Sequence, residues 1–195
     1  MMKMKKLMIL AVMMVATLTA SAQQKTGTWS ITPTAAINLS TIVGDNTDNA
    51  SMKVGLAAGA DAMYQISPLV GVSGGLLYSM QGANGSGDYK FNLDELLIPI
   101  LANFYVYPNL ALKVGLQPGF IVSAKSKTDK VETDIKDNCQ SVEISLPLGI
   151  SYEISNFVIG ARYNLGLSKL NKGDGSRRNS VIMFSLGYKI PLGGR

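Results

Sequence analysis

Apolar and polar residues alternate along most of the chain after residue 28, in segments bounded by Gly, Pro, Asn and Asp. Residues 142–154 show the pattern most regularly, because every second residue from Val142 to Ile154 is apolar and those between are Glu, Ser, Pro and Gly. A period of two places successive side chains on opposite faces of a β-strand. The pattern predicts eight strands, at residues 29–39, 54–66, 69–80, 93–107, 110–123, 141–154, 157–167 and 181–192.

The connections between these predicted strands alternate between short and long. Three links hold two residues each, and the four others are long and polar, at residues 40–53, 81–92, 124–140 and 168–180. This is the connectivity of an antiparallel up-and-down barrel with its turns at one end and its loops at the other. In outer-membrane barrels the short turns face the periplasm, and an even strand count places both termini at that end.

The two faces of the predicted strands differ in composition. One face is aliphatic and carries no Lys, Arg, Asp or Glu in the last four strands, whereas the other is rich in Gly, Ser and Ala with isolated charges. A Lys or Arg facing lipid at the bilayer midplane costs roughly 2–4 kcal/mol, so lipid contact explains the charge-free face. Every backbone amide in hydrocarbon must be paired, so the sheet must close. We predict an all-β fold, an eight-stranded antiparallel up-and-down transmembrane β-barrel.

The polar face predicts a barrel interior that contains ionisable residues. Charges buried at this spacing must pair, so we expect a structural charge network in the lumen. Its predicted members are Asp61, Glu95, Lys113, Glu143, Glu153, Arg162 and Lys189. Aromatic residues near strand ends are candidates either for a membrane-interface girdle or for packing. They are Trp29, Tyr64, Tyr78, Tyr105, Tyr107, Tyr152 and Tyr188.

The N-terminus has the order of a secretory signal peptide. Three lysines precede the apolar residues 7–18, and Ala20-Ser21-Ala22 forms a small-x-small cleavage site. We therefore predict a signal peptide at residues 1–22 and a secreted barrel domain at residues 23–195; a short anchor helix is the alternative. Loss of the three lysines lowers the formal net charge from +5 to +2, so the basic composition gives no reason to expect nucleic-acid binding.

Few residues suggest catalytic or metal chemistry. The chain has no histidine, which excludes Ser-His-Asp triads, Cys-His pairs and histidine metal sites. Glu143 and Glu153 lie ten residues apart on one strand, on the order of 33 Å, too far for paired acid–base work. We predict no enzyme, no cofactor and no metal. Cys139, the single cysteine, is either a free thiol or an intermolecular partner.

Two of the long loops contain residues that could bind a ligand, although each loop could also be a solvated surface without one. Asp45, Asp48 and the neighbouring Asn46 and Asn49 carry oxygen ligands of the kind that Ca²⁺ prefers, although the spacing lacks an EF-hand pattern. The third loop interleaves basic and acidic residues, so it is either a mixed-charge surface or a contact for lipopolysaccharide phosphate. Its lysines are Lys125, Lys127, Lys130 and Lys136.

Two stretches resemble a known family. Residues 96–127 read LLIPILANFYVYPNLALKVGLQPGFIVSAKSK, and residues 142–170 read VEISLPLGISYEISNFVIGARYNLGLSKL. The "IP" strand, the short turn, the G-x-x-P-G-F strand and the "ARYNLGL" strand are similar to the Bacteroidetes-type, PorT-like outer-membrane β-barrel family. The chain departs from that family at Leu97, where an acidic residue is common. The resemblance implies the barrel fold and an outer-membrane location, and it implies no activity.

We therefore expect a non-enzymatic outer-membrane barrel that is structural, or accessory to envelope assembly or secretion, and acts through its extracellular loops. The expected partners are outer-membrane lipid and lipopolysaccharide, the barrel assembly machinery and an envelope protein that contacts the loops. Three alternatives are a narrow outer-membrane pore, a soluble periplasmic barrel that binds an apolar ligand, and an adhesin-like receptor that acts through the third loop.

Overall fold

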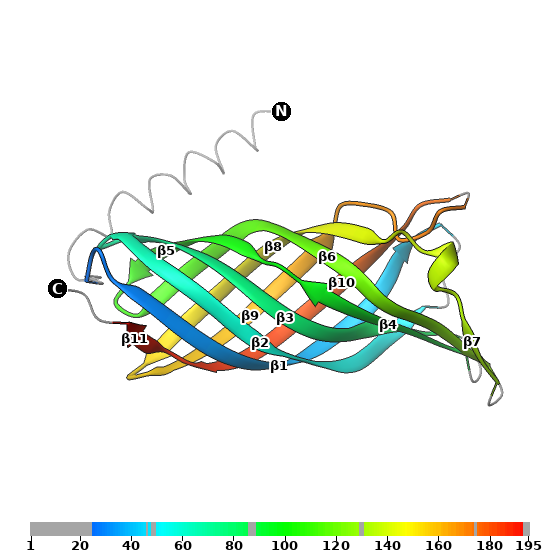
Figure 1. Cartoon of the computed structure of the whole chain (residues 1–195), viewed down its shortest axis with the longest axis horizontal. Coiled ribbons are helices and arrows are strands. Elements are labelled where there is room, and N and C mark those ends of the chain that lie inside the picture. The colour runs from blue at the N-terminus through cyan, green and yellow to red at the C-terminus, as the bar shows by residue number, and fades with distance from the viewer. Residues whose placement is uncertain are drawn as a thin grey trace, which may run out of the picture.

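A computed structural model of the chain describes residues 25–45, 47, 50–85, 89–128, 131–173 and 175–192. One antiparallel sheet closes into a barrel, because β1 pairs with both β2 and β10 (Figure 1). The strands are β1 (Trp29–Gly44), β2 (Ser51–Ser67), β3 (Val70–Asn84), β4 (Lys90–Leu97), β5 (Ile100–Tyr107), β6 (Leu110–Thr128), β7 (Val131–Asp134), β8 (Val142–Ile154), β9 (Phe157–Gly166), β10 (Arg177–Tyr188) and β11 (Ile190–Leu192). The predicted signal peptide, residues 1–22, lies outside the described residues.

The wall of the barrel has eight strands, as predicted. β4 and β5 are two parts of one strand between β3 and β6, interrupted at Ile98-Pro99 because proline cannot donate a ladder hydrogen bond. Ile98 N still donates to the Pro118 carbonyl over 2.8 Å, which keeps the interruption within the wall. β7 pairs only with β6, and β11 continues β10 along β1. The eight-stranded up-and-down fold is confirmed.

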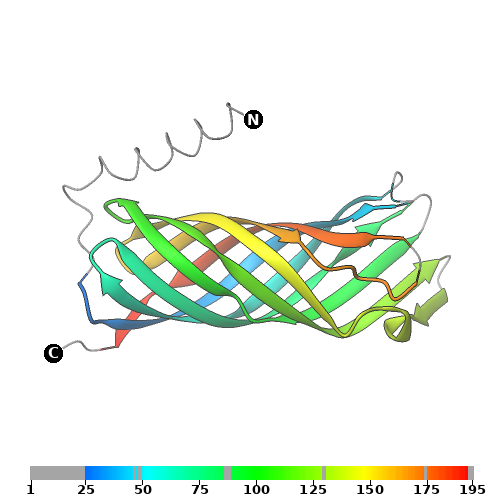
Figure 2. The same cartoon turned by 90° about the horizontal axis from the view of Figure 1, so that it is seen from above.

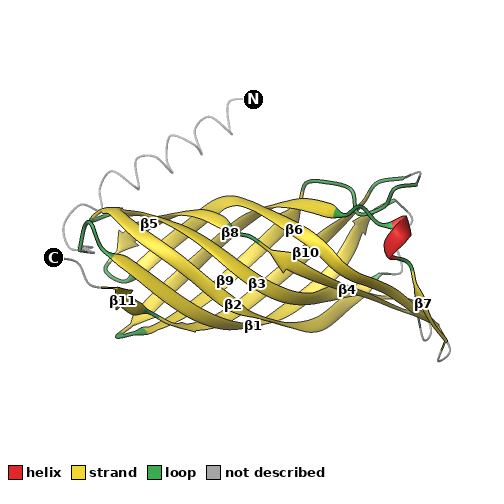
Figure 3. Ribbon diagram, in the orientation of Figure 1, coloured by secondary structure: helices red, strands yellow, loops and turns green. Residues whose placement is uncertain are grey.

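The two ends of the barrel differ as the connection lengths predict. Figure 2 shows tight turns at the end where the described chain begins and finishes, which we call the turn end. The two-residue turns place Asn109 and Ser155 at positive φ, as tight hairpins require. The opposite, loop end carries the longer connections and the 3-10 turn η1 (Lys136–Asn138), the single red element in Figure 3. Within the described residues, no helix is long and apolar enough to cross a membrane.

The long connections are shorter than predicted, because several strands extend past the apolar pattern. β1 runs to Gly44, β3 to Asn84 and β6 to Thr128, through residues predicted as loops. Antiparallel backbone hydrogen bonds continue regardless of side-chain polarity, so the loss of apolar alternation marks where the buried or lipid-covered part ends and not where the strand ends. The extended end of β6 and its partner β7 project beyond the rest of the loop end (Figure 1).

The outer face of the wall is aliphatic and exposed, as the alternation predicts. The exposed fraction is 66% for the Val54 side chain and 60% for that of Leu56. Proteins in water rarely expose so extensive an apolar surface, whereas a barrel wall in contact with lipid does. Six of the seven candidate girdle aromatics face outward, and the rings of Trp29 and Tyr64 lie 4.9 Å apart at the turn end. Tyr105 is the exception. It is buried in the lumen, because β5 places it on the same face as Asn103 and Leu101.

Candidate functional site

Side chains fill the interior of the barrel in three levels. A hydrophobic plug separates two polar layers, and it consists of Ala36, Ala57, Leu77, Leu97 and Met183. The order along each strand shows the separation. On β4 and β5, Glu95 precedes Leu97 and Tyr105 follows it, and on β10, Asn179 precedes Met183 and Gly187 follows it. Leu97 is fully buried and both Leu77 and Met183 are 2% exposed, so the plug closes the lumen at mid-height.

The polar layer on the turn-end side of the plug is charged, and we call it the turn-end layer. Glu153 accepts a hydrogen bond from Lys189 Nζ over 2.8 Å and another from Tyr105 Oη over 2.7 Å. Lys189 Nζ also lies 6.0 Å from the centre of the Tyr105 ring. Because one carboxylate meets both a cation and a hydroxyl donor, the desolvation cost of this partly buried pair is offset.

Asp61 completes the turn-end layer on the opposite wall. It lies within electrostatic reach of Lys113 and Arg162, and all three line one small cavity with Glu153 and Lys189. The cavity holds about 70 Å³, enough for a few waters at ~10–15 Å³ of probe volume each, and it is too small for an organic ligand. The layer is therefore a packed mixed-charge network and not an open channel.

The polar layer on the loop-end side of the plug contains two acids among neutral side chains, and we call it the loop-end layer. Glu95 on β4 and Glu143 on β8 both approach Gly119 of the intervening β6, and they are 0% and 2% exposed. Asn179 donates to Gln81, and Gln81 and Asn38 both donate to Ser79. The Glu95 carboxyl meets Glu143, and its oxygens accept no hydrogen bond from an amide, hydroxyl or cation among the described residues. Two adjacent buried carboxyls without a cation are a costly arrangement.

The seven predicted lumen residues thus form two groups in place of one network. The structure brings Asp61, Lys113, Glu153, Arg162 and Lys189 together and places Glu95 and Glu143 beyond the plug. The alternation of apolar and polar residues relates Glu143 to Glu153 on its own strand and does not indicate its actual neighbour, Glu95. Glu95 lies two strands away along the barrel wall, and only the register of β4 and β8 against β6 shows that the two acids meet. The polar partners Tyr105 and Asn179 were also missed.

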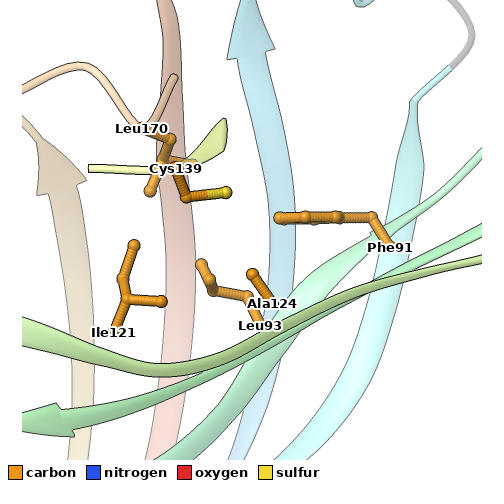
Figure 4. Packing of buried hydrophobic residues seen from close by; sticks show 6 residues of the cluster. All are labelled: Phe91, Leu93, Ile121, Ala124, Cys139 and Leu170. Atoms are coloured by element: carbon orange, nitrogen blue, oxygen red, sulfur yellow. The ribbon is translucent and has the colours of Figure 1, made fainter. Parts of the chain in front are cut away.

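A second hydrophobic group lies at the loop end, beyond the loop-end layer. Figure 4 shows its six members, Phe91, Leu93, Ile121, Ala124, Cys139 and Leu170, which come from β4, β6 and the loops that cross the barrel mouth. We call it the mouth cluster. Leu93 and Ala124 are fully buried, and Leu93 is the member of the cluster on β4 that lies closer to the loop-end layer. Two backbone contacts join the connection before β8 to the one after β9 at this end. Cys139 and Asn171 form an isolated antiparallel β-bridge, and Gln140 N donates a hydrogen bond to the Leu170 carbonyl.

The loop residues singled out in the sequence have structural partners. Cys139 is a buried free cysteine, and burial raises the pKa of its thiol. Lys125 forms an exposed ion pair with Glu132 across β6 and β7 over 2.6 Å, which raises the pKa of Lys125 and lowers that of Glu132. Asp45 accepts a hydrogen bond from Ser176 N. The other candidate Ca²⁺ ligands, Asn46, Asp48 and Asn49, lie outside the described residues, as does Lys130.

Comparison with known proteins agrees with this geometry. A family model described as an outer membrane protein beta-barrel domain matches residues 21–172. The attachment invasion locus protein Ail of Yersinia pestis has a similar structure, with a TM-score of 0.54 and 19% identity over 85% of this chain and 99% of that one. Neisserial surface protein A is also similar, with a TM-score of 0.55 and 14% identity over 84% and 97%. At these identities the likeness shows the fold alone. A comparison with curated proteins gives no match.

Proposed function

The chain belongs to the family of outer membrane protein beta-barrel domains and lies in the outer membrane, and from this premise we propose that it is a non-enzymatic contact protein. In this proposal the barrel is a rigid anchor, structural or accessory to envelope assembly or secretion, and its loop end is the surface that meets partners. A secreted chain with a cleaved signal peptide, inserted by the barrel assembly machinery, fits the same proposal. The finer resemblance to the PorT-like family is part of this proposal too.

The observation that carries the proposal is the closed lumen. The plug residues Leu77, Leu97 and Met183 are nearly or fully buried, and the mouth cluster closes the loop end a second time. An eight-stranded barrel has an interior just wide enough for side chains. The narrow-pore alternative therefore ranks below a role in which the wall faces lipid and the loop end faces outward.

The loop end offers the surface that a contact role needs. β7 projects beyond the rim, all four of its residues are exposed, and Val131 at its start is 67% exposed. The β6–β7 hairpin carries Lys125, Lys127, Glu132 and Asp134 on paired positions, a mixed-charge ladder suited to polar partners such as lipopolysaccharide headgroups or an envelope protein. Ail, which has a similar fold, is known in complex with the heparin analogue sucrose octasulfate.

The test is complementation of cells that lack the protein, scored as resistance to detergents and bulky antibiotics. One variant replaces the four residues of β7 with Ser and Gly, which leaves every strand of the barrel wall unchanged. The matched control is Asn109→Gly at the turn end, where a positive φ suits glycine. Heat-modifiable migration on gels checks that both variants form closed barrels.

We expect the β7 variant to fold and to fail in complementation, and Asn109→Gly to complement fully. Equal complementation by both variants, together with reduced solute uptake in cells without the protein, would contradict the contact role and favour a pore.

A further inference from the structure

A cavity of about 340 Å³ lies at the loop end, directly against the mouth cluster. Its volume is near the lower end of the ~300–1,000 Å³ that is usual for small-molecule sites. Phe91, Leu170 and Cys139 of the mouth cluster line it, joined by Ile42 and Ile135. In Figure 4 the Cys139 sulfur points toward the Phe91 ring. The buried pair Leu93 and Ala124 lies beneath, so a molecule in this cavity would be held and not passed into the lumen.

The cavity is lined mostly by apolar side chains, together with a few polar ones. Arg177 at the start of β10 is the only charged residue among the described residues that line it. Its neighbours there are uncharged, among them Asn138 and Asn171. The main chain of Arg177 is fixed, because its N–H donates to Asn171 and its carbonyl accepts from Leu170 N. Its Nε has only a long 3.5 Å contact with the Asp45 carbonyl, and no carboxylate among the described residues forms an ion pair with it.

A mostly apolar cavity with one charged residue, Arg177, in its lining has a definite chemical preference. Its walls favour an aromatic or aliphatic body, since burial of apolar area drives binding. The guanidinium presents a planar fork of donors that matches a carboxylate. We propose that the mouth cavity binds a small apolar carboxylate, with the apolar body between Phe91, Leu170 and Cys139 and the carboxylate at Arg177. This site goes beyond the proposed contact role and does not depend on it.

Cys139 supplies a local readout for the test. It is the only cysteine in the chain, it lines the cavity, and its burial makes labelling by a maleimide slow. A ligand in the cavity shields the thiol further. The probe is 1-naphthoate, a two-ring carboxylate, added to the full-length protein in lipid nanodiscs. Partition of the probe into lipid lowers its free concentration but does not itself protect Cys139.

Three variants and one analogue separate the parts of the proposal. Arg177→Gln removes the charge at the cavity, and Arg178→Gln is its matched control, because Arg178 is the next residue on β10 and does not line the cavity. Ile135→Trp fills the cavity from a connection outside the strands, so it spares the barrel wall. The analogue 1-naphthamide keeps the rings and lacks the charge. Heat-modifiable migration confirms that each variant is folded.

We expect 1-naphthoate to slow labelling several-fold in the unchanged protein and in Arg178→Gln, and to have no effect in Ile135→Trp. Arg177→Gln should need roughly tenfold more 1-naphthoate for the same protection, which is about 1.4 kcal/mol. The amide should protect the unchanged protein as weakly as 1-naphthoate protects Arg177→Gln. Unchanged labelling at saturating 1-naphthoate, or equal protection in Ile135→Trp, would overturn the site. Equal protection by the acid and the amide would overturn the role of Arg177.

Discussion

The two polar layers of the lumen contain acids in opposite settings. In the turn-end layer, Glu153 meets Lys189 and Tyr105 directly, and Asp61 lies near two more cations. In the loop-end layer, Glu95 and Glu143 meet each other, among amides and hydroxyls. The two layers show that the inward direction of an ionisable side chain does not determine which partners it has. The same residue type meets a cation where its register supplies one and a second buried acid where the register supplies that, so we expect the two settings to affect stability differently.

The largest effect should come from breaking the plug that keeps the layers apart. Leu97→Ala removes a fully buried side chain from a rigid wall, so we expect a loss of about 3 kcal/mol in the free energy of unfolding. Urea titration in lipid vesicles, followed by the fluorescence of the single tryptophan Trp29, measures it. Leu96→Ala is the control, because Leu96 is the neighbour of Leu97 on β4 and its side chain faces outward and is more exposed. An equal loss in both variants would contradict a packed plug.

The next effect tests the turn-end layer. Glu153→Gln keeps the shape of the side chain but leaves Lys189 without its carboxylate, and the pair is only 10–15% exposed. We expect a loss of about 2–3 kcal/mol in the same titration. Lys189→Met in the Glu153→Gln background should recover part of the loss, because it removes the cation that has lost its Glu153 carboxylate. A double variant that is less stable than Glu153→Gln alone would argue against direct pairing.

The same substitution in the loop-end layer should have the opposite sign. Glu95→Gln removes one of two adjacent buried carboxyls and offers an amide donor to Glu143, so we expect a gain of about 1 kcal/mol. Changes of opposite sign in the free energy of unfolding for Glu95→Gln and Glu153→Gln would distinguish the two layers most clearly. A loss from Glu95→Gln as large as that from Glu153→Gln would mean that the loop-end acids are compensated as well.

The smallest effect should come from an ion pair outside the lumen. Lys125 and Glu132 are 2.6 Å apart, yet both side chains are 45% exposed, so water screens their attraction. We expect Lys125→Ala to leave the unfolding midpoint unchanged. A clear shift would show that pairing distance alone, without burial, decides the effect of a charge in this protein.

Much of the fold could be predicted from the sequence, for a physical reason. Lipid contact imposes a strict period of two, so every second residue of 142–154 and the two-residue links fixed the strands and their connectivity. The strand ends were wrong where pairing continues without an apolar face, as at Lys125–Thr128. The sequence left Tyr105 as a candidate either for the girdle or for packing, and only its parity with Asn103 within β5 places it inside.

The candidate site was less predictable, because alternation fixes which face a residue lies on but not its neighbours across the barrel. The inward direction of Glu95 and Glu143 follows from the pattern, whereas their meeting at Gly119 depends on the register shift between β4 and β6 at Asp94 and Glu95. The mouth cavity depends on connections that fold back over the barrel, and Cys139 and Leu170 carry no periodic signal.

The closed lumen is the observation on which the proposed contact role rests. Single-channel recording of the purified protein in planar lipid bilayers tests it most directly, with a porin of known conductance as the positive control. The closed plug predicts that heat-modifiable, folded protein produces no conductance steps. Reproducible steps from the unchanged protein would contradict the account and identify the barrel as a pore.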